Sequence, residues 1–145
     1  MKIVAAQIDL GRQKEKIEFI KSFVDNAEKW GYNTIILYLE CSIRTKVTPF
    51  FDEDDTYSMT EIKEIADYIE DKGLLAIPAF ENFYHIEKLL QYKEAANLSE
   101  FKDERTEGRG WAPQRVKRGS VGCTSNPDFN KFFDAYITEV CSAYS

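Results

Sequence analysis

The sequence predicts an α/β fold in which parallel strands alternate with helices. Three short apolar runs, at residues 2–8, 34–39 and 74–77, are separated by segments whose apolar residues recur at helical spacing. The run at 34–39 is continuously apolar rather than alternating, which is typical of a strand buried on both faces of a parallel sheet. A helix after each strand returns the chain to a parallel neighbour.

The first two helices are predicted over residues 13–30 and 58–73. Gly31 ends the first, and Ser58 begins the second with capping-box spacing to Glu61. Their apolar faces consist of Ile17, Ile20, Val24 and Ala27 in the first helix and Ile62, Ile65, Ala66 and Ile69 in the second.

The last third of the chain is less regular. A helix is predicted over residues 85–92, and residues 102–125 have no periodicity and hold four of the seven glycines. We expect a long mobile loop over 102–125. Asn126 then reads as a helix cap, with Pro127 at the first position of a final helix.

Two architectures fit this order of elements: an open doubly wound sheet, or the first three units of an eight-stranded barrel. A full barrel needs about 250 residues, so the 145 residues of this chain would supply only part of one. Residues 1–145 are expected to belong to one domain in either case.

The composition excludes several classes of protein. Hydrophobic residues make up 43%, as in a globular protein, and the net charge of -6 argues against nucleic-acid binding. The chain has no apolar run that could span a membrane and no signal-peptide pattern, so a cytoplasmic location is expected. No phosphate-binding loop, cysteine pair or metal motif is present, and we expect no cofactor and no metal.

Polar side chains follow each predicted strand. Asp9 ends the first strand, Glu40 ends the second, and Glu81 and His85 follow the third. Ligand sites of parallel α/β folds form at the carboxyl ends of strands, so these residues are delivered to one rim. Tyr84 is a candidate for stacking on a sugar. The structural alternatives are that Asp9 caps a turn and that Glu81 is a solvated loop residue.

Four segments together resemble one enzyme family. Residues 77–90 resemble the third-strand segment of the family 20 glycoside hydrolases, in particular the hexosaminidase D-like branch. Residues 57–65 resemble the start of a helix in that branch, and residues 123–127 resemble its Cys-Thr-x-Asn-Pro segment. Asp9-Leu10-Gly11-Arg12 is similar to the Asp-x-x-Arg that follows the first strand in the wider family.

This resemblance implies the first three units of a (β/α)8 TIM barrel that removes terminal β-N-acetylhexosamine residues. The partner would be a glycan that contains an N-acetylhexosaminide. Arg12 would bind the 3- and 4-hydroxyls of the terminal sugar. Glu40 and His85 would support the general acid, and the substrate-binding set would consist of Asp9, Arg12, Glu81 and Tyr84.

The implied reaction is substrate-assisted, with retention of configuration. The acetamido oxygen of the sugar attacks the anomeric carbon, an Asp polarises the acetamido group and an adjacent Glu protonates the leaving oxygen. That Asp-Glu pair follows the fourth strand in the family, and neither Glu53-Asp54 nor Asp103-Glu104 has this context. We therefore expect the pair beyond residue 145 and no hydrolysis by the 145-residue chain alone.

Two alternatives remain open. Val4-Ala5-Ala6-Gln7, Gly31 and the strand that ends at Glu40 resemble the opening of nitrilase-type amidases, although Leu39 replaces the proline of that family. The chain would otherwise be a truncated, non-catalytic α/β sugar-binding module. A partial barrel exposes a strand edge, which favours self-association.

Overall fold

The computed structural model describes residues 2–81, 83–101, 105–107, 114–116 and 121–144. The chain divides into two compact units. The first consists of Met1–Phe80 together with Tyr136–Ser145, and the second consists of Glu81–Ala135. Within the described residues, no helix is long and apolar enough to cross a bilayer.

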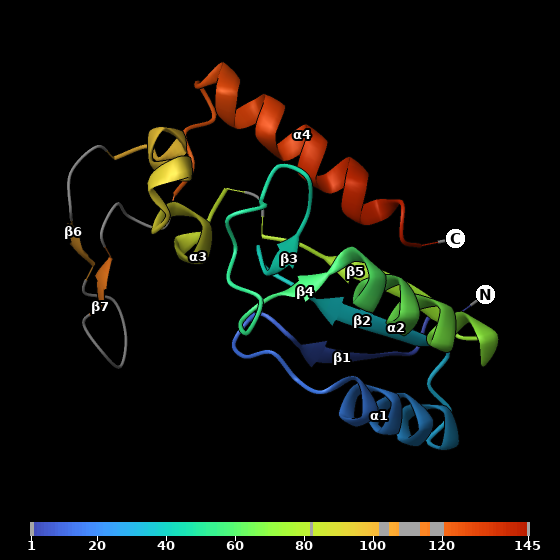
Figure 1. Cartoon of the computed structure of the whole chain (residues 1–145). Coiled ribbons are helices and arrows are strands. Elements are labelled where there is room, and N and C mark those ends of the chain that lie inside the picture. The colour runs from blue at the N-terminus through green and yellow to red at the C-terminus, as the bar shows by residue number, and fades with distance from the viewer. Residues whose placement is uncertain (1, 82, 102–104, 108–113, 117–120, 145) are drawn as a thin grey trace. The chain divides into compact units, whose positions relative to one another are not determined.

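A three-stranded parallel sheet forms the centre of the first unit (Figure 1). It consists of β1 (Ala5–Asp9), β2 (Thr34–Tyr38) and β5 (Leu75–Ala79), in the order β1-β2-β5. Ala5 pairs with Thr34, which pairs with Leu75, and the register continues in step to the carboxyl ends. The predicted parallel strands are confirmed.

Helices α1 (Ile17–Lys29) and α2 (Met59–Asp71) supply the two crossovers of this sheet. The predicted capping box of α2 is present, because the Ser58 hydroxyl accepts a hydrogen bond from the Glu61 amide at 3.2 Å. The Glu61 carboxylate in turn accepts from the Ser58 amide at 2.7 Å. Both helices bury the predicted apolar faces, except that Ile17 is only half-buried.

The flanks of α1 and α2 lie against each other and are joined by polar contacts. Lys72 forms an ion pair with Asp25 at 2.8 Å, and the Tyr68 hydroxyl donates to the same carboxylate at 2.7 Å. Hydrogen bonds from Lys72 and then Tyr68 hold the pKa of Asp25 below its usual value. Three strands that follow one another in order, with adjacent helices, fit three units of a barrel, and one half of a doubly wound sheet has the same order.

The segment between β2 and α2 contains a feature that the sequence did not predict. A short parallel pair lies here, β3 (Ile43–Arg44) with β4 (Tyr57–Ser58), and no strand was predicted at either position. Tyr136 is buried against this pair, and its hydroxyl accepts a hydrogen bond from the Ile43 amide at 3.2 Å.

The second unit contains short elements. The predicted helix at 85–92 is shorter in the structure, where α3 (Glu87–Leu90) precedes a 3-10 helix (Lys93–Leu98). Within the range predicted as a loop, β6 (Arg105–Glu107) pairs antiparallel with β7 (Gln114–Val116). Residues 102–104, 108–113 and 117–120 lie outside the described residues, and mobility of 102–125 stays a prediction.

The final helix, α4 (Pro127–Cys141), begins at the predicted proline. Its first half contributes to the core of the second unit, where the rings of Phe129 and Phe133 are 4.9 Å apart. Gly122 lies directly against Phe129, since a Cβ at position 122 would be 2.0 Å from its ring. From Tyr136 onward the helix belongs to the first unit.

Replacement of Ser58 by Ala removes the side-chain cap of α2. We expect the free energy of unfolding to fall by about 1 kcal/mol, because one amide at the helix start loses its partner. Urea denaturation would measure this. Ser22→Ala is the matched control, because Ser22 is exposed within α1 and its replacement should be close to neutral. Equal losses in both variants would contradict the capping role.

Candidate functional site

The candidate site lies at the carboxyl ends of the parallel strands. Asp9 is the last residue of β1 and pairs in register with Tyr38, the last residue of β2. The ladder continues past the strand ends, where the Leu10 amide donates to the Tyr38 carbonyl oxygen at 2.8 Å. Glu40 follows two residues after Tyr38, so Asp9 and Glu40 lie at the same end of the sheet.

Glu40 is held closely by its surroundings. Its side chain is buried, and an added Cβ on Gly11 would lie 2.7 Å from its Cγ and 2.8 Å from its Cδ. Glycine is therefore required at position 11 for the Glu40 side chain to occupy this place. Glu40 also has a φ of 47°, in the left-handed region that residues other than glycine seldom adopt. Strained backbone of this kind is concentrated at functional sites.

Asp9 and Arg12 form the turn that follows β1. One carboxylate oxygen of Asp9 accepts a hydrogen bond from the Gly11 amide at 3.0 Å, so the capping role considered for Asp9 is present. Its other oxygen lies 3.8 Å from Nε of Arg12. The Arg12 side chain is 73% exposed, and an ion pair this exposed contributes little to stability. The guanidinium is thus accessible to a ligand.

The second unit contains a separate group of candidate side chains, in the segment that follows β5. The rings of Tyr84 and His85 are 5.8 Å apart, and Nδ1 of His85 lies 3.8 Å from a carboxylate oxygen of Glu87. Tyr84 and His85 are exposed, and Glu81 is half-buried. His85 has a φ of 56°, whereas Tyr84 is not in the left-handed region. The backbone of Tyr84 therefore has no strain of that kind.

The structure thus brings Asp9, Arg12 and Glu40 together in the first unit, and Tyr84 and His85 together in the second. Sequence reasoning missed Gly11, which appeared there only as part of the segment from Asp9 to Arg12. The only signal was its place between Asp9 and Arg12. Its contact with Glu40, 29 positions away, produces no pattern that a single sequence could reveal.

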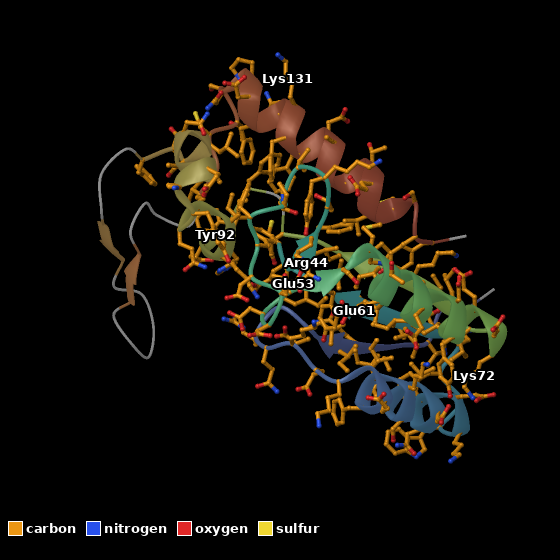
Figure 2. All side chains as sticks on the ribbon, in the orientation of Figure 1. Arg44, Glu53, Glu61, Lys72, Tyr92 and Lys131 are labelled. Atoms are coloured by element: carbon orange, nitrogen blue, oxygen red, sulfur yellow. The ribbon has the colours of Figure 1, made fainter. Side chains whose placement is uncertain are left out.

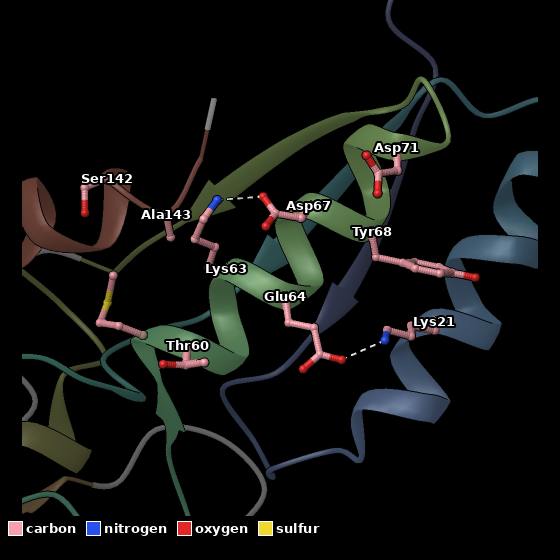
Figure 3. A pocket seen from close by; sticks show the side chains of 10 residues that line it. Lys21, Thr60, Lys63, Glu64, Asp67, Tyr68, Asp71, Ser142 and Ala143 are labelled. Carbon is pink, nitrogen blue, oxygen red and sulfur yellow. Dashed lines mark hydrogen bonds and ion pairs between the residues drawn. The ribbon is translucent and has the colours of Figure 1, made fainter.

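A hollow elsewhere on the first unit is a weaker candidate (Figure 3). Charged side chains of α1 and α2 line it, and none of the strand-end residues does. Lys21 pairs with Glu64 at 2.7 Å and Lys63 pairs with Asp67 at 2.8 Å, so these charges are satisfied by one another. Among the described residues, no three histidine, cysteine or acidic side chains are grouped to hold a metal ion.

Comparison with known proteins identifies the fold. No family model and no curated protein sequence matches the chain. A β-N-acetylhexosaminidase from Bacteroides fragilis matches with a TM-score of 0.75 and 24% identity, over 97% of this chain and 29% of that one. A family 20 chitobiase from Flavobacterium johnsoniae matches with a TM-score of 0.76 and 19% identity, over 98% of this chain and 22% of that one.

A third structure is the family 20 exo-β-N-acetylglucosaminidase from Vibrio harveyi in complex with N-acetylglucosamine. It matches with a TM-score of 0.77 and 17% identity, over 98% of this chain and 26% of that one. The chain therefore spans less than a third of the length of each of these structures. At these identities the likeness establishes the fold. The chain has the fold of three β/α units of the TIM-barrel catalytic domain of family 20 hexosaminidases, as the sequence resemblance implied.

Proposed function

We propose that this chain is the sugar-binding part of a glycoside hydrolase that removes terminal β-N-acetylhexosamine residues. The observation that carries the proposal is the arrangement of Arg12 and Glu40 at the carboxyl ends of adjacent strands, in a fold shared with hexosaminidases. The chain also covers under a third of those enzymes, which fits a part rather than the whole of a catalytic barrel.

Arg12 is proposed to bind the 3- and 4-hydroxyls of the terminal sugar. A guanidinium presents several donors in one plane, and this fork suits two neighbouring oxygen atoms. The exposure of Arg12 and its weak ion pair with Asp9 support this role, because binding of a ligand would break only a weak interaction.

Glu40 and His85 are proposed to orient and tune the general acid, and Asp9, Glu81 and Tyr84 to complete the sugar site. The close packing of Glu40 against Gly11 supports such a positioning role. The reaction would be substrate-assisted, with the acetamido oxygen of the sugar as the nucleophile. An Asp-Glu pair would polarise this group and protonate the leaving oxygen. It would follow a further strand of the barrel, which is neither β1, β2 nor β5 of the central sheet.

The direct test begins with the intact mass of the protein in its native source. The native-length protein is then assayed on an aryl N-acetyl-β-glucosaminide. Arg12→Ala should lower kcat/KM by about 10- to 100-fold, the effect of losing charged hydrogen bonds to the sugar. Lys29→Ala, which removes an exposed cation at the end of α1, is the control and should have no effect.

A native chain of 145 residues without hydrolytic activity would overturn the hydrolase proposal and leave a sugar-binding module. Activity on amides but not on the aryl sugar would favour the nitrilase-type alternative instead.

Gly11→Ala tests the placement of Glu40. The added methyl group would overlap the Glu40 side chain and displace it, so kcat/KM should fall about tenfold or more. Gly31→Ala is the matched control: it has a φ of 84° but open space around the position, so it should cost stability and leave activity unchanged. Full activity in folded Gly11→Ala protein would argue against a role for Glu40.

A further inference from the structure

The loop between β1 and α1, residues 10–16, is held by the buried side chain of Tyr57. The Tyr57 hydroxyl accepts a hydrogen bond from the Glu15 amide at 2.7 Å and donates one to the Glu15 carbonyl oxygen at 3.1 Å. One phenol thus satisfies both backbone groups of a single residue. This contact also accounts for the start of α1 at Ile17 rather than at residue 13, since Glu15 is bonded outside the helix.

Lys14 strengthens the same attachment. Its ammonium group forms an ion pair with Glu61 at 3.1 Å and donates to the Glu53 carbonyl oxygen at 3.1 Å. It also lies 5.7 Å from the centre of the Tyr57 ring. Figure 2 labels Glu53 and Glu61, the two residues whose oxygen atoms Lys14 contacts. Lys14 and Glu61 are about three-quarters buried, so water weakens this pair less than a surface pair.

Glu61 ties the loop to the start of α2. Burial opposes ionisation of its carboxyl group, but hydrogen bonds from Ser58 and Lys14 outweigh this effect and lower the pKa of Glu61. The carboxylate that completes the capping box is therefore also the partner of the loop. Residues 57–61 belong to the segment that resembles the start of a hexosaminidase helix, and they have no role in the proposed reaction. Their contacts with Lys14 and Glu15 support the neighbouring loop.

The two attachments lie on either side of Arg12. Before it, Gly11 is bonded to Asp9 and packed against Glu40. After it, Lys14 and Glu15 are held by Tyr57 and its neighbours. The stretch between them is short, so the direction in which Arg12 leaves the backbone depends on both attachments.

We propose that Tyr57 is a positioning residue for the sugar site, which fixes the loop so that Arg12 faces the 3- and 4-hydroxyls of the bound sugar. This inference rests on the proposed function. Burial raises the pKa of Tyr57 to about 12, so the hydroxyl keeps the proton that it donates to Glu15 throughout the neutral range. Because Arg12 would contact groups that do not react, Tyr57 affects binding of the sugar rather than the chemical step.

Tyr57→Phe in the native-length protein tests the inference, because it removes the hydroxyl and keeps the ring. We expect KM to rise about three- to tenfold, the equivalent of one hydrogen bond, with kcat changed less than about twofold. Amide exchange at Glu15 should become about tenfold faster. Tyr68→Phe is the matched control, since it removes another hydroxyl that joins neighbouring elements but leaves the Arg12 loop intact.

A purely structural role would give a different pattern. Loss of folded protein would lower the apparent kcat and leave KM unchanged, and this result for Tyr57→Phe would overturn the inference. An equal increase of KM in Tyr68→Phe would overturn it as well. Lys14→Gln, which weakens the same attachment from the loop side, should also raise KM and serves if Tyr57→Phe does not fold. No hydrolysis by the unsubstituted native-length protein would instead overturn the proposed function, and the inference with it.

Discussion

The parallel pairing of β1, β2 and β5 is the constraint on which the rest of the first unit depends. Parallel strands cannot be joined by tight turns, so each connection is a long crossover, and in this sheet both crossovers contain a helix. The in-step register brings the ends of the three strands to one level, where Asp9 and Glu40 emerge. The position of these carboxylates is thus a result of backbone hydrogen bonding, before any side chain takes part.

The loops at this end are ordered by contacts from residues distant in the sequence. The β1–α1 loop takes its shape from Glu40 on one side and from Tyr57 and Glu61 on the other. At the far side of the unit, α1 and α2 are joined by contacts to Asp25 from Lys72 and Tyr68. The two helices are therefore linked at both ends, and the loop that carries Arg12 lies at one of them.

The regular part of the fold was predictable because it depends on local patterns. The capping box of Ser58 and Glu61 and the proline at the start of α4 are present as predicted, and so are the apolar faces of α1 and α2 apart from the half-buried Ile17. The fold class follows from those elements, and the strand-end positions of Asp9 and Glu40 follow from the fold class.

The contacts that shape the site could not be predicted in the same way. The β3–β4 pair has only two residues in each strand, too few to produce an alternating pattern. The bond of Tyr57 to Glu15 spans 42 positions and involves backbone groups, which every residue type except proline offers equally. The left-handed backbone of Glu40 could not be predicted either, because glutamate has no preference for that conformation.

Glu40 has a consequence for how this sequence can change over time. A buried carboxylate in a left-handed backbone is an unfavourable choice for folding alone, and glycine would adopt the same φ without that cost. Under the proposed role of Glu40 in supporting the general acid, stability and activity act in opposite directions at this one position. Selection for stability alone would then replace the glutamate, and only the proposed role of the carboxylate would retain it. A gene copy released from selection for that role should lose the residue early, well before the parallel sheet itself decays.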